Sequence, residues 1–235
     1  MIGLSAIRPR AVPKTLSSVF TDVTQDPNKT LLVFPDALKW LEPPGPGSEK
    51  DWICRPSQLT EAGFPSGADL DTDIAFLVHL VNWIKTEYPA IERIWLMGFS
   101  RGSEMAMLAA TQPAVVEVDG YALSHRGWPD ELDMGDLDTT RAIGLWTAPN
   151  DPLEGEGDTA TFAATAAAFA AAFGATEDGS SPTTKNCGGT NNMQVHTYSG
   201  GGPFKWWSRN GGHVWISVSN CYEENYFRVW LHNQT

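Results

Sequence analysis

Residues 93–110 read RIWLMGFSRGSEMAMLAA, and this stretch carries the clearest indication of the fold. The apolar run at residues 94–97 predicts a short buried strand, and the sequence EMAMLAATQ at residues 104–112 predicts a helix. Between them lies a G-x-S-x-G pattern centred on Ser100. Small residues two positions either side of the serine let strand and helix approach closely. We therefore expect Ser100 to project from a sharp turn at the carboxyl end of the strand.

The rest of the chain alternates between strand patterns and helix patterns. Apolar or alternating runs predict strands at residues 29–34, 116–123, 142–147 and 194–198. Amphipathic or alanine-rich runs predict helices at residues 69–88, 158–173 and 222–232, the second capped by Asp158 and ended by Gly174. Residues 41–67 and 179–192 predict surface loops. This alternation predicts an α/β fold class: a mostly parallel sheet with helices on both faces, in a single domain over residues 1–235.

A serine hydroxyl is a weak nucleophile until an oriented base removes its proton. After a serine in a strand–turn–helix setting, the partners follow in the order acid, then histidine. Asp151 lies just past the predicted strand at residues 142–147, so we expect it to be the acid. Competing carboxylates lie in an acidic stretch typical of a solvated loop; they are Asp130, Asp133, Asp136 and Asp138.

His213 lies in the glycine-rich sequence NGGHVW at residues 210–215, which can carry an imidazole over the sheet edge to the serine. We expect it to be the base; the alternative is a structural loop histidine. Of the other histidines, His79 and His125 have no acid-then-histidine pattern behind them, His196 lies inside a strand pattern, and His232 is nearly terminal. The backbone N–H of Arg101, at the start of the helix, is the predicted oxyanion donor.

Composition and net charge limit the classes of molecule that the chain is expected to bind. The chain has 235 residues and a formal net charge of −12, which argues against nucleic acid or an anionic membrane as a partner. No apolar stretch approaches the ~20 residues of a membrane-spanning helix, and residues 1–5 do not read as a secretory signal. The histidines and cysteines lack metal-ligand spacing, so we expect no metal and no cofactor.

Three cysteines predict one disulfide with a thiol left over. Cys187 and Cys221 bracket the proposed base, so we expect these two to pair and Cys54 to remain reduced. The alternative is three buried free thiols.

The ten tryptophans are many for this length. Trp206, Trp207 and Trp215 flank the His213 loop and could form a platform for a sugar ring, a phenolic acid or a polyester unit. The alternative is hydrophobic packing under the loop. The tryptophans at 95, 146 and 230 fall in predicted strands or a helix and are expected in the core.

Four stretches together resemble the secreted polyhydroxybutyrate depolymerase, feruloyl esterase and acetyl xylan esterase group. They are LLVFPDAL at 31–38, DTDIAFLVHLV at 71–81, RIWLMGFSRGSEMAMLAA at 93–110 and GGHVW at 211–215. The resemblance spans roughly residues 30–232. It implies the α/β-hydrolase fold, an extracellular location, and hydrolysis of an ester in or on a polymer, such as a polyester or a plant cell-wall ester. It maps the family's triad onto Ser100, Asp151 and His213.

The chain departs from that group in two places. Residues 1–28 match neither the upstream His-Gly loop that donates a second oxyanion N–H nor the leading strands of the fold, which raises the alternative that these strands are missing. Ser103 stands where the group usually has glycine or alanine.

The sequence is compatible with three functions. The first is a serine carboxylesterase acting through a covalent acyl-enzyme. The second is a catalytically weak polymer- or glycan-binding protein on the same scaffold, and the third is a serine peptidase of the same fold.

Overall fold

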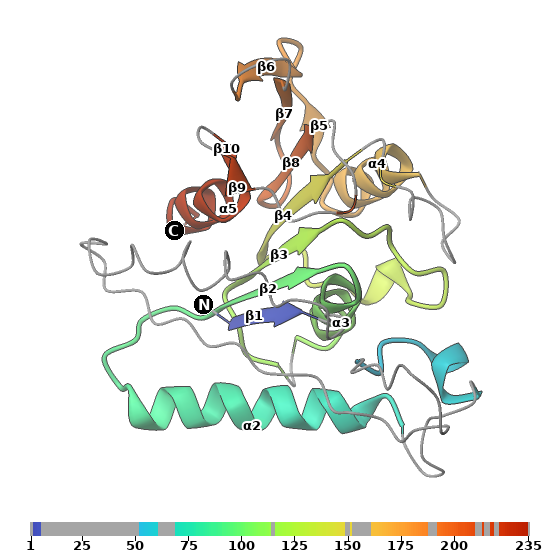
Figure 1. Cartoon of the computed structure of the whole chain (residues 1–235), viewed down its shortest axis with the longest axis vertical. Coiled ribbons are helices and arrows are strands. Elements are labelled where there is room, and N and C mark those ends of the chain that lie inside the picture. The colour runs from blue at the N-terminus through green and yellow to red at the C-terminus, as the bar shows by residue number, and fades with distance from the viewer. Residues whose placement is uncertain are drawn as a thin grey trace.

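The computed structural model of the chain describes residues 2–5, 52–60, 69–113, 116–148, 151, 161–187, 192–209, 213, 217–218 and 221–234. Within them, the main sheet has eight strands in the order β1-β2-β3-β4-β8-β7-β5, with β6 paired to β7 (Figure 1). The strands are β1 (Ile2–Ser5), β2 (Trp95–Phe99), β3 (Gly120–Ser124), β4 (Ala142–Thr147), β5 (Thr176–Glu177), β6 (Thr183–Asn186), β7 (Asn192–Ser199) and β8 (Phe204–Arg209).

The sheet is parallel over its larger part. β1, β2, β3, β4 and β8 run in one direction, whereas β7 is antiparallel to β8, and β5 and β6 are antiparallel to β7. A separate antiparallel pair is formed by β9 (Ser217–Val218) and β10 (Cys221–Tyr222). The predicted α/β architecture with a mostly parallel sheet is therefore confirmed.

Helices cover both faces of this sheet. The described helices are η2 (Pro56–Thr60), α2 (Asp71–Glu87), α3 (Arg101–Ala110), η3 (Met134–Asp136), α4 (Phe162–Ala172) and α5 (Glu223–His232). Figure 1 shows α3 and α4 on one side of the sheet and α5 on the other. Successive residues of a strand point to opposite faces of the sheet. In β2, Leu96 packs in the core on the side of α3 and α4, whereas Trp95 and Met97 pack in the core on the side of α5.

Several sequence predictions are confirmed at the level of whole elements. The amphipathic pattern at 69–88 forms α2, whose residues Ile74, Leu77, Val81 and Ile84 are buried. The strand predicted at 142–147 is β4, and the pattern at 222–232 is α5. Gly174 ends α4 with φ +63°, the left-handed conformation that suits glycine.

Other boundaries differ from the prediction. The strand expected from residue 116 begins only at Gly120, because Val116 and Val118 pack as a buried lead-in with turn hydrogen bonds. The cap of α4 is Thr161, whose Oγ1 accepts from Ala164 N at 3.2 Å, so the predicted Asp158 cap is wrong. The loop predicted at 179–192 contains β6, whose four residues are all exposed and so carry no hydrophobic signal.

Three strands or segments had no clear signal in the sequence. Among the described strands, β1 lies at one end of the sheet order, beside β2, although no leading strand was predicted, and β8 lies in the middle of the sheet. Trp52, Ile53 and Cys54 lie in the predicted surface stretch 41–67 yet are buried. Each depends on a partner distant in sequence. The strand predicted at 29–34 lies outside the described residues.

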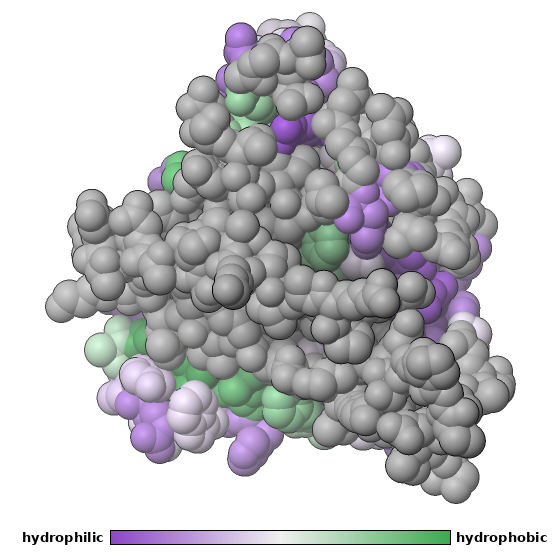
Figure 2. Space-filling model, viewed as in Figure 1, coloured by the Kyte–Doolittle hydropathy of each residue, from purple (hydrophilic) through white to green (hydrophobic). Residues whose placement is uncertain are grey.

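The outer face of α2 remains partly apolar. Phe76 is 39% exposed and Trp83 is 43% exposed. At the lower left of Figure 2, hydrophobic residues lie beside hydrophilic ones at the surface, in the region where Figure 1 places α2. None of the helices in the described part of the chain combines the length and apolarity needed to cross a membrane.

The predicted disulfide is confirmed. Cys187 and Cys221 are bonded, with their Cα atoms 5.3 Å apart, and link the end of β6 to β10 just before α5. Cys54 is a buried free thiol.

Candidate active site

Ser100 stands on a strained turn between β2 and α3. Its backbone has φ 55° and ψ −123°, a conformation that a non-glycine residue rarely adopts. The turn is held from both sides: Ser100 N donates to Ser124 O at 2.9 Å, and Ser100 O accepts from Ser103 N at 2.8 Å. Strain of this kind costs of order 1–3 kcal/mol and persists only where surrounding contacts enforce it.

Gly98, the first glycine of the G-x-S-x-G pattern, is required by this close approach. A Cβ at Gly98 would overlap the backbone carbonyl of Gly102 and would lie 2.5 Å from Ser103 N. Strand and helix backbones therefore touch directly behind the serine, as the sequence pattern predicted.

Ser103 has a structural role in the same turn. Its buried Oγ accepts from Ser124 N at 3.0 Å, while Ser124 O accepts from Ser100 N. The end of β3 is thus tied to both the serine turn and the first turn of α3. A glycine or alanine at position 103 could not make the first of these bonds.

Asp151 and His213 are joined at the carboxyl edge of the sheet. His213 Nδ1 donates to Asp151 Oδ2 at 2.8 Å. The Asp151 side chain is fully buried, and that of His213 is 20% exposed. Asp151 follows β4, and its N–H donates to Ala148 O at 2.8 Å, which places the carboxylate just beyond the strand end.

A second histidine, which was not predicted as a site residue, contacts the same carboxylate oxygen. His125 Nδ1 lies 3.0 Å from Asp151 Oδ2, and both side chains are fully buried. Burial holds the pKa of His125 below its ordinary value, and the hydrogen bond to Asp151 only partly opposes this. His125 is therefore neutral near pH 7 and donates its Nδ1 proton to the carboxylate. A polar residue directly after a buried strand was the signal that could have found it.

Phe99 connects this pair to the serine. The ring of Phe99, the residue before Ser100, lies 4.9 Å from the ring of His213 and 5.1 Å from that of His125, centroid to centroid. Among the described residues, no hydrogen bond joins Ser100 Oγ to His213. Catalytic hydrogen bonds are often long without substrate and tighten when it binds.

Arg101, the predicted oxyanion donor, is the first residue of α3. The backbone N–H groups at this end of a helix face out of it and favour negative charge. The Arg101 side chain joins a buried ionic network, donating to Glu104 Oε2 at 3.1 Å. Arg55 and Arg126 also pair with Glu104, whose carboxylate is fully buried. The predicted lack of an upstream oxyanion loop concerns residues 1–28, of which only residues 2–5 are described.

The side chains that meet at Asp151 Oδ2 are also close enough together to be considered as ligands of one metal ion. His125, Asp151 and His213 offer ligand atoms within 4.8 Å of one another. However, both Nδ1 atoms lie at hydrogen-bond distance from a carboxylate oxygen, and a carboxylate accepts but does not donate. Each Nδ1 therefore carries a proton and has no lone pair for a metal.

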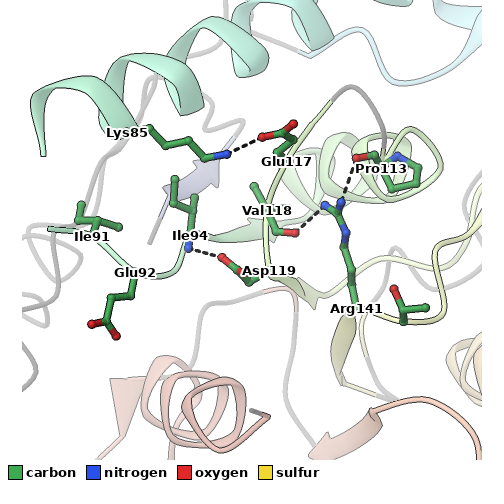
Figure 3. A pocket seen from close by; sticks show the side chains of 10 residues that line it. Lys85, Ile91, Glu92, Ile94, Pro113, Glu117, Val118, Asp119 and Arg141 are labelled. Atoms are coloured by element: carbon green, nitrogen blue, oxygen red, sulfur yellow. Dashed lines mark hydrogen bonds and ion pairs between the residues drawn. The ribbon is translucent and has the colours of Figure 1, made fainter. Parts of the chain in front are cut away.

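A cavity of about 640 Å³ lies at the other end of the strands from Ser100, at the amino ends of β2, β3 and β4 (Figure 3). Several of its polar groups are engaged with one another or with backbone carbonyls of the lining. Lys85 pairs with Glu117 at 2.6 Å, Ile94 N donates to Asp119, and Arg141 donates to Pro113 O and Val118 O. The cavity is distant from Ser100 along the strands and contributes nothing to the chemistry there.

The predicted tryptophan platform is only partly available. Trp207 is 2% exposed and packs with Trp146 and Phe227, so for this residue the structure supports packing. Trp206 is half-buried, donates to Thr147 Oγ1 at 2.8 Å and stacks on His196 at 3.8 Å. Trp215 lies outside the described residues.

Comparison with known proteins supports the fold. No family model matches the chain, and no curated protein matches it. Among solved structures, the chain is similar to a variant of SOBER1 from Arabidopsis thaliana, with a TM-score of 0.53 and 14% identity over 99% of this chain and 98% of that one. The chain therefore has the α/β-hydrolase fold. At this identity the likeness concerns the fold and does not identify an esterase group.

Proposed function

Because the chain has the α/β-hydrolase fold, we propose that it is a serine hydrolase of carboxylic esters. In this proposal Ser100 is the nucleophile, His213 the general base and Asp151 the residue that orients the base. The observation that carries it is the strained Ser100 turn beside the Asp151–His213 hydrogen bond, with Phe99 in contact with the imidazole. Strained serines and oriented imidazoles are what acyl transfer requires.

The reaction would proceed in two halves. His213 Nε2 takes the proton of Ser100 as its oxygen attacks the ester carbonyl, and the oxyanion develops beside the Arg101 N–H at the start of α3. The imidazolium then gives its proton to the departing alkoxide, leaving an acyl-enzyme. A water attacks this ester in the reverse sense, returning its proton through His213 and releasing the acid.

The preferred substrate class is an ester in or on a polymer, such as a polyester or a feruloyl or acetyl ester of plant cell walls. The sequence resemblance favours this class, and the half-buried Trp206 beside the end of β4 offers an aromatic surface near the site. An extracellular location is consistent with the Cys187–Cys221 disulfide.

The test compares hydrolysis of p-nitrophenyl acetate and butyrate by the wild type, Ser100→Ala and Ser199→Ala. Ser199 is an exposed serine at the end of β7 and is the matched control. We expect Ser100→Ala to lose at least ~10³-fold in kcat, and Ser199→Ala to match the wild type. A fluorophosphonate label should attach to Ser100 alone, as located by mass spectrometry. Equal turnover by the wild type and Ser100→Ala would refute the proposal.

Substrate panels separate the alternatives. Methyl ferulate, acetylated xylan and a polyhydroxybutyrate film report the polymer-ester classes, and a peptide anilide reports a peptidase. Tight binding of one polymer without turnover would favour the binding protein.

A further inference from the structure

The strand order places His125 between the nucleophile and the acid. β3 lies between β2 and β4 in the sheet, so the residue after β3 stands between Ser100, which follows β2, and Asp151, which follows β4. Three backbone features hold it there. His125 has φ 56°, its N–H donates to Trp146 O at 2.9 Å, and the preceding Ser124 is bonded to the serine turn. A non-glycine residue in this conformation needs such support.

Two imidazoles share one carboxylate oxygen at this position. His213 Nδ1 and His125 Nδ1 lie 2.8 and 3.0 Å from Asp151 Oδ2. The two rings are nearly perpendicular, at 84°, with centroids 5.9 Å apart. Because Oδ2 accepts from both, the negative charge that it offers to one imidazole is reduced by the other.

We infer that His125 is a positioning residue of the proposed reaction: its Nδ1–H fixes the Asp151 carboxylate and takes a share of its negative charge, which limits how strongly Asp151 stabilises the imidazolium of His213. The inference rests on the proposed function, since it takes His213 as the base. A base that is held less firmly in its protonated form keeps working at lower pH.

Other charged groups near this edge come from separate elements. Arg126 follows His125, Glu104 and Arg101 lie on α3, and Arg55 lies just before η2. These four side chains form one network around the Glu104 carboxylate. A substitution confined to position 125 leaves all of them in place, so a change in pH dependence would report on the donor to Asp151.

Three variants separate the hydrogen bond from the volume of the ring. His125→Asn places an amide N–H at the position of Nδ1 and tolerates positive φ. His125→Leu has the same branching as asparagine but no donor. His125→Gly removes the donor, suits φ 56°, and takes the place of the leucine variant if that protein does not fold.

The experiment measures kcat/KM for p-nitrophenyl butyrate from pH 5 to 9 in each variant. Without the donor, the imidazolium of His213 is stabilised more strongly, so we expect the acid limb of the profile to move up by about 0.5–1 pH unit, a three- to tenfold loss below the limb. His125→Asn should keep the wild-type limb. In parallel, NMR follows the Cε1–H resonance of His213 with pH, assigned by its loss in His213→Gln, and should show the same shift in its midpoint.

The outcomes separate the two proposals. If the wild type shows no Ser100-dependent hydrolysis, the proposed function fails, while the NMR midpoint still tests the link between His125 and His213. If the wild type is active and the asparagine variant shares its limb and midpoint with leucine or glycine, whether shifted or not, the inference is overturned and His125 serves packing alone.

Discussion

Replacing Gly98 by alanine tests the geometry on which the candidate site depends. The new Cβ would overlap the carbonyl of Gly102 and lie 2.5 Å from Ser103 N. Ordinary carbon contacts begin near 3.5 Å, so β2 and α3 would have to separate by at least about 1 Å. Neither neighbour is a flexible side chain, because both contacts are with backbone.

Two losses should follow from this separation. Overpacking of this kind costs about 1–3 kcal/mol, which for a chain of this size lowers the melting temperature by about 2–4 °C per kcal/mol. A displacement of the Ser100 oxygen by about 1 Å should also slow fluorophosphonate labelling by about 100-fold. Thermal unfolding by circular dichroism and labelling kinetics measure the two effects separately.

Gly179→Ala is the matched control. Gly179 lies in the turn between β5 and β6, and a Cβ there meets nothing within 4 Å. This variant should melt and label like the wild type. If Gly98→Ala also melts within 1 °C of the wild type, which corresponds to about 0.25–0.5 kcal/mol and so to at most about half of the smallest expected packing cost, the close-approach reasoning is refuted. If it melts lower but labels at the wild-type rate, the link from turn geometry to Ser100 reactivity is refuted.

Three further predictions concern stability. Glu104→Gln leaves the guanidinium groups of Arg55 and Arg126 buried without their shared carboxylate, so unfolding in urea should show a loss of about 3–5 kcal/mol; a loss under 1 kcal/mol would contradict this. Cys187→Ser with Cys221→Ser opens a loop of 34 residues and should cost about 3–4 kcal/mol, with no further effect of reductant on the variant. Burial lowers the pKa of His125 below 6.5, so the unfolded chain binds a proton there that the folded chain does not. Stability should therefore fall as pH drops below 6.5, by up to about 1.4 kcal/mol per pH unit, and His125→Asn should lessen the slope between pH 7.5 and 5.5; equal slopes would count against a buried neutral imidazole.

Sequence patterns were sufficient wherever the information is local. The turn at Ser100 needs only an apolar run, a helix former and glycines that allow backbone contact, and all three lie within residues 93–110. The helical spacing of the buried residues of α2 is likewise visible within the 17 residues of that helix. The pairing of Cys187 with Cys221 was also predicted, since few cysteines leave few choices.

Sequence patterns could not predict that His125 and His213 share the Asp151 carboxylate. His125, Asp151 and His213 meet because β3 lies between β2 and β4 and because His213, 62 residues further along the chain, is bonded to Asp151. Strand order is set by the packing of the whole sheet. The same holds for β1 and β8, because Ile2 pairs with Leu96, 94 residues away, and Phe204 pairs with Ile143, 61 residues away. It also holds for Trp207, which is buried because of the face of the sheet on which it lies. Periodicity along the chain determines which residues are buried and where a turn forms. Which distant residues share one hydrogen-bond acceptor is decided only when the tertiary structure forms, because those contacts have no period in the sequence.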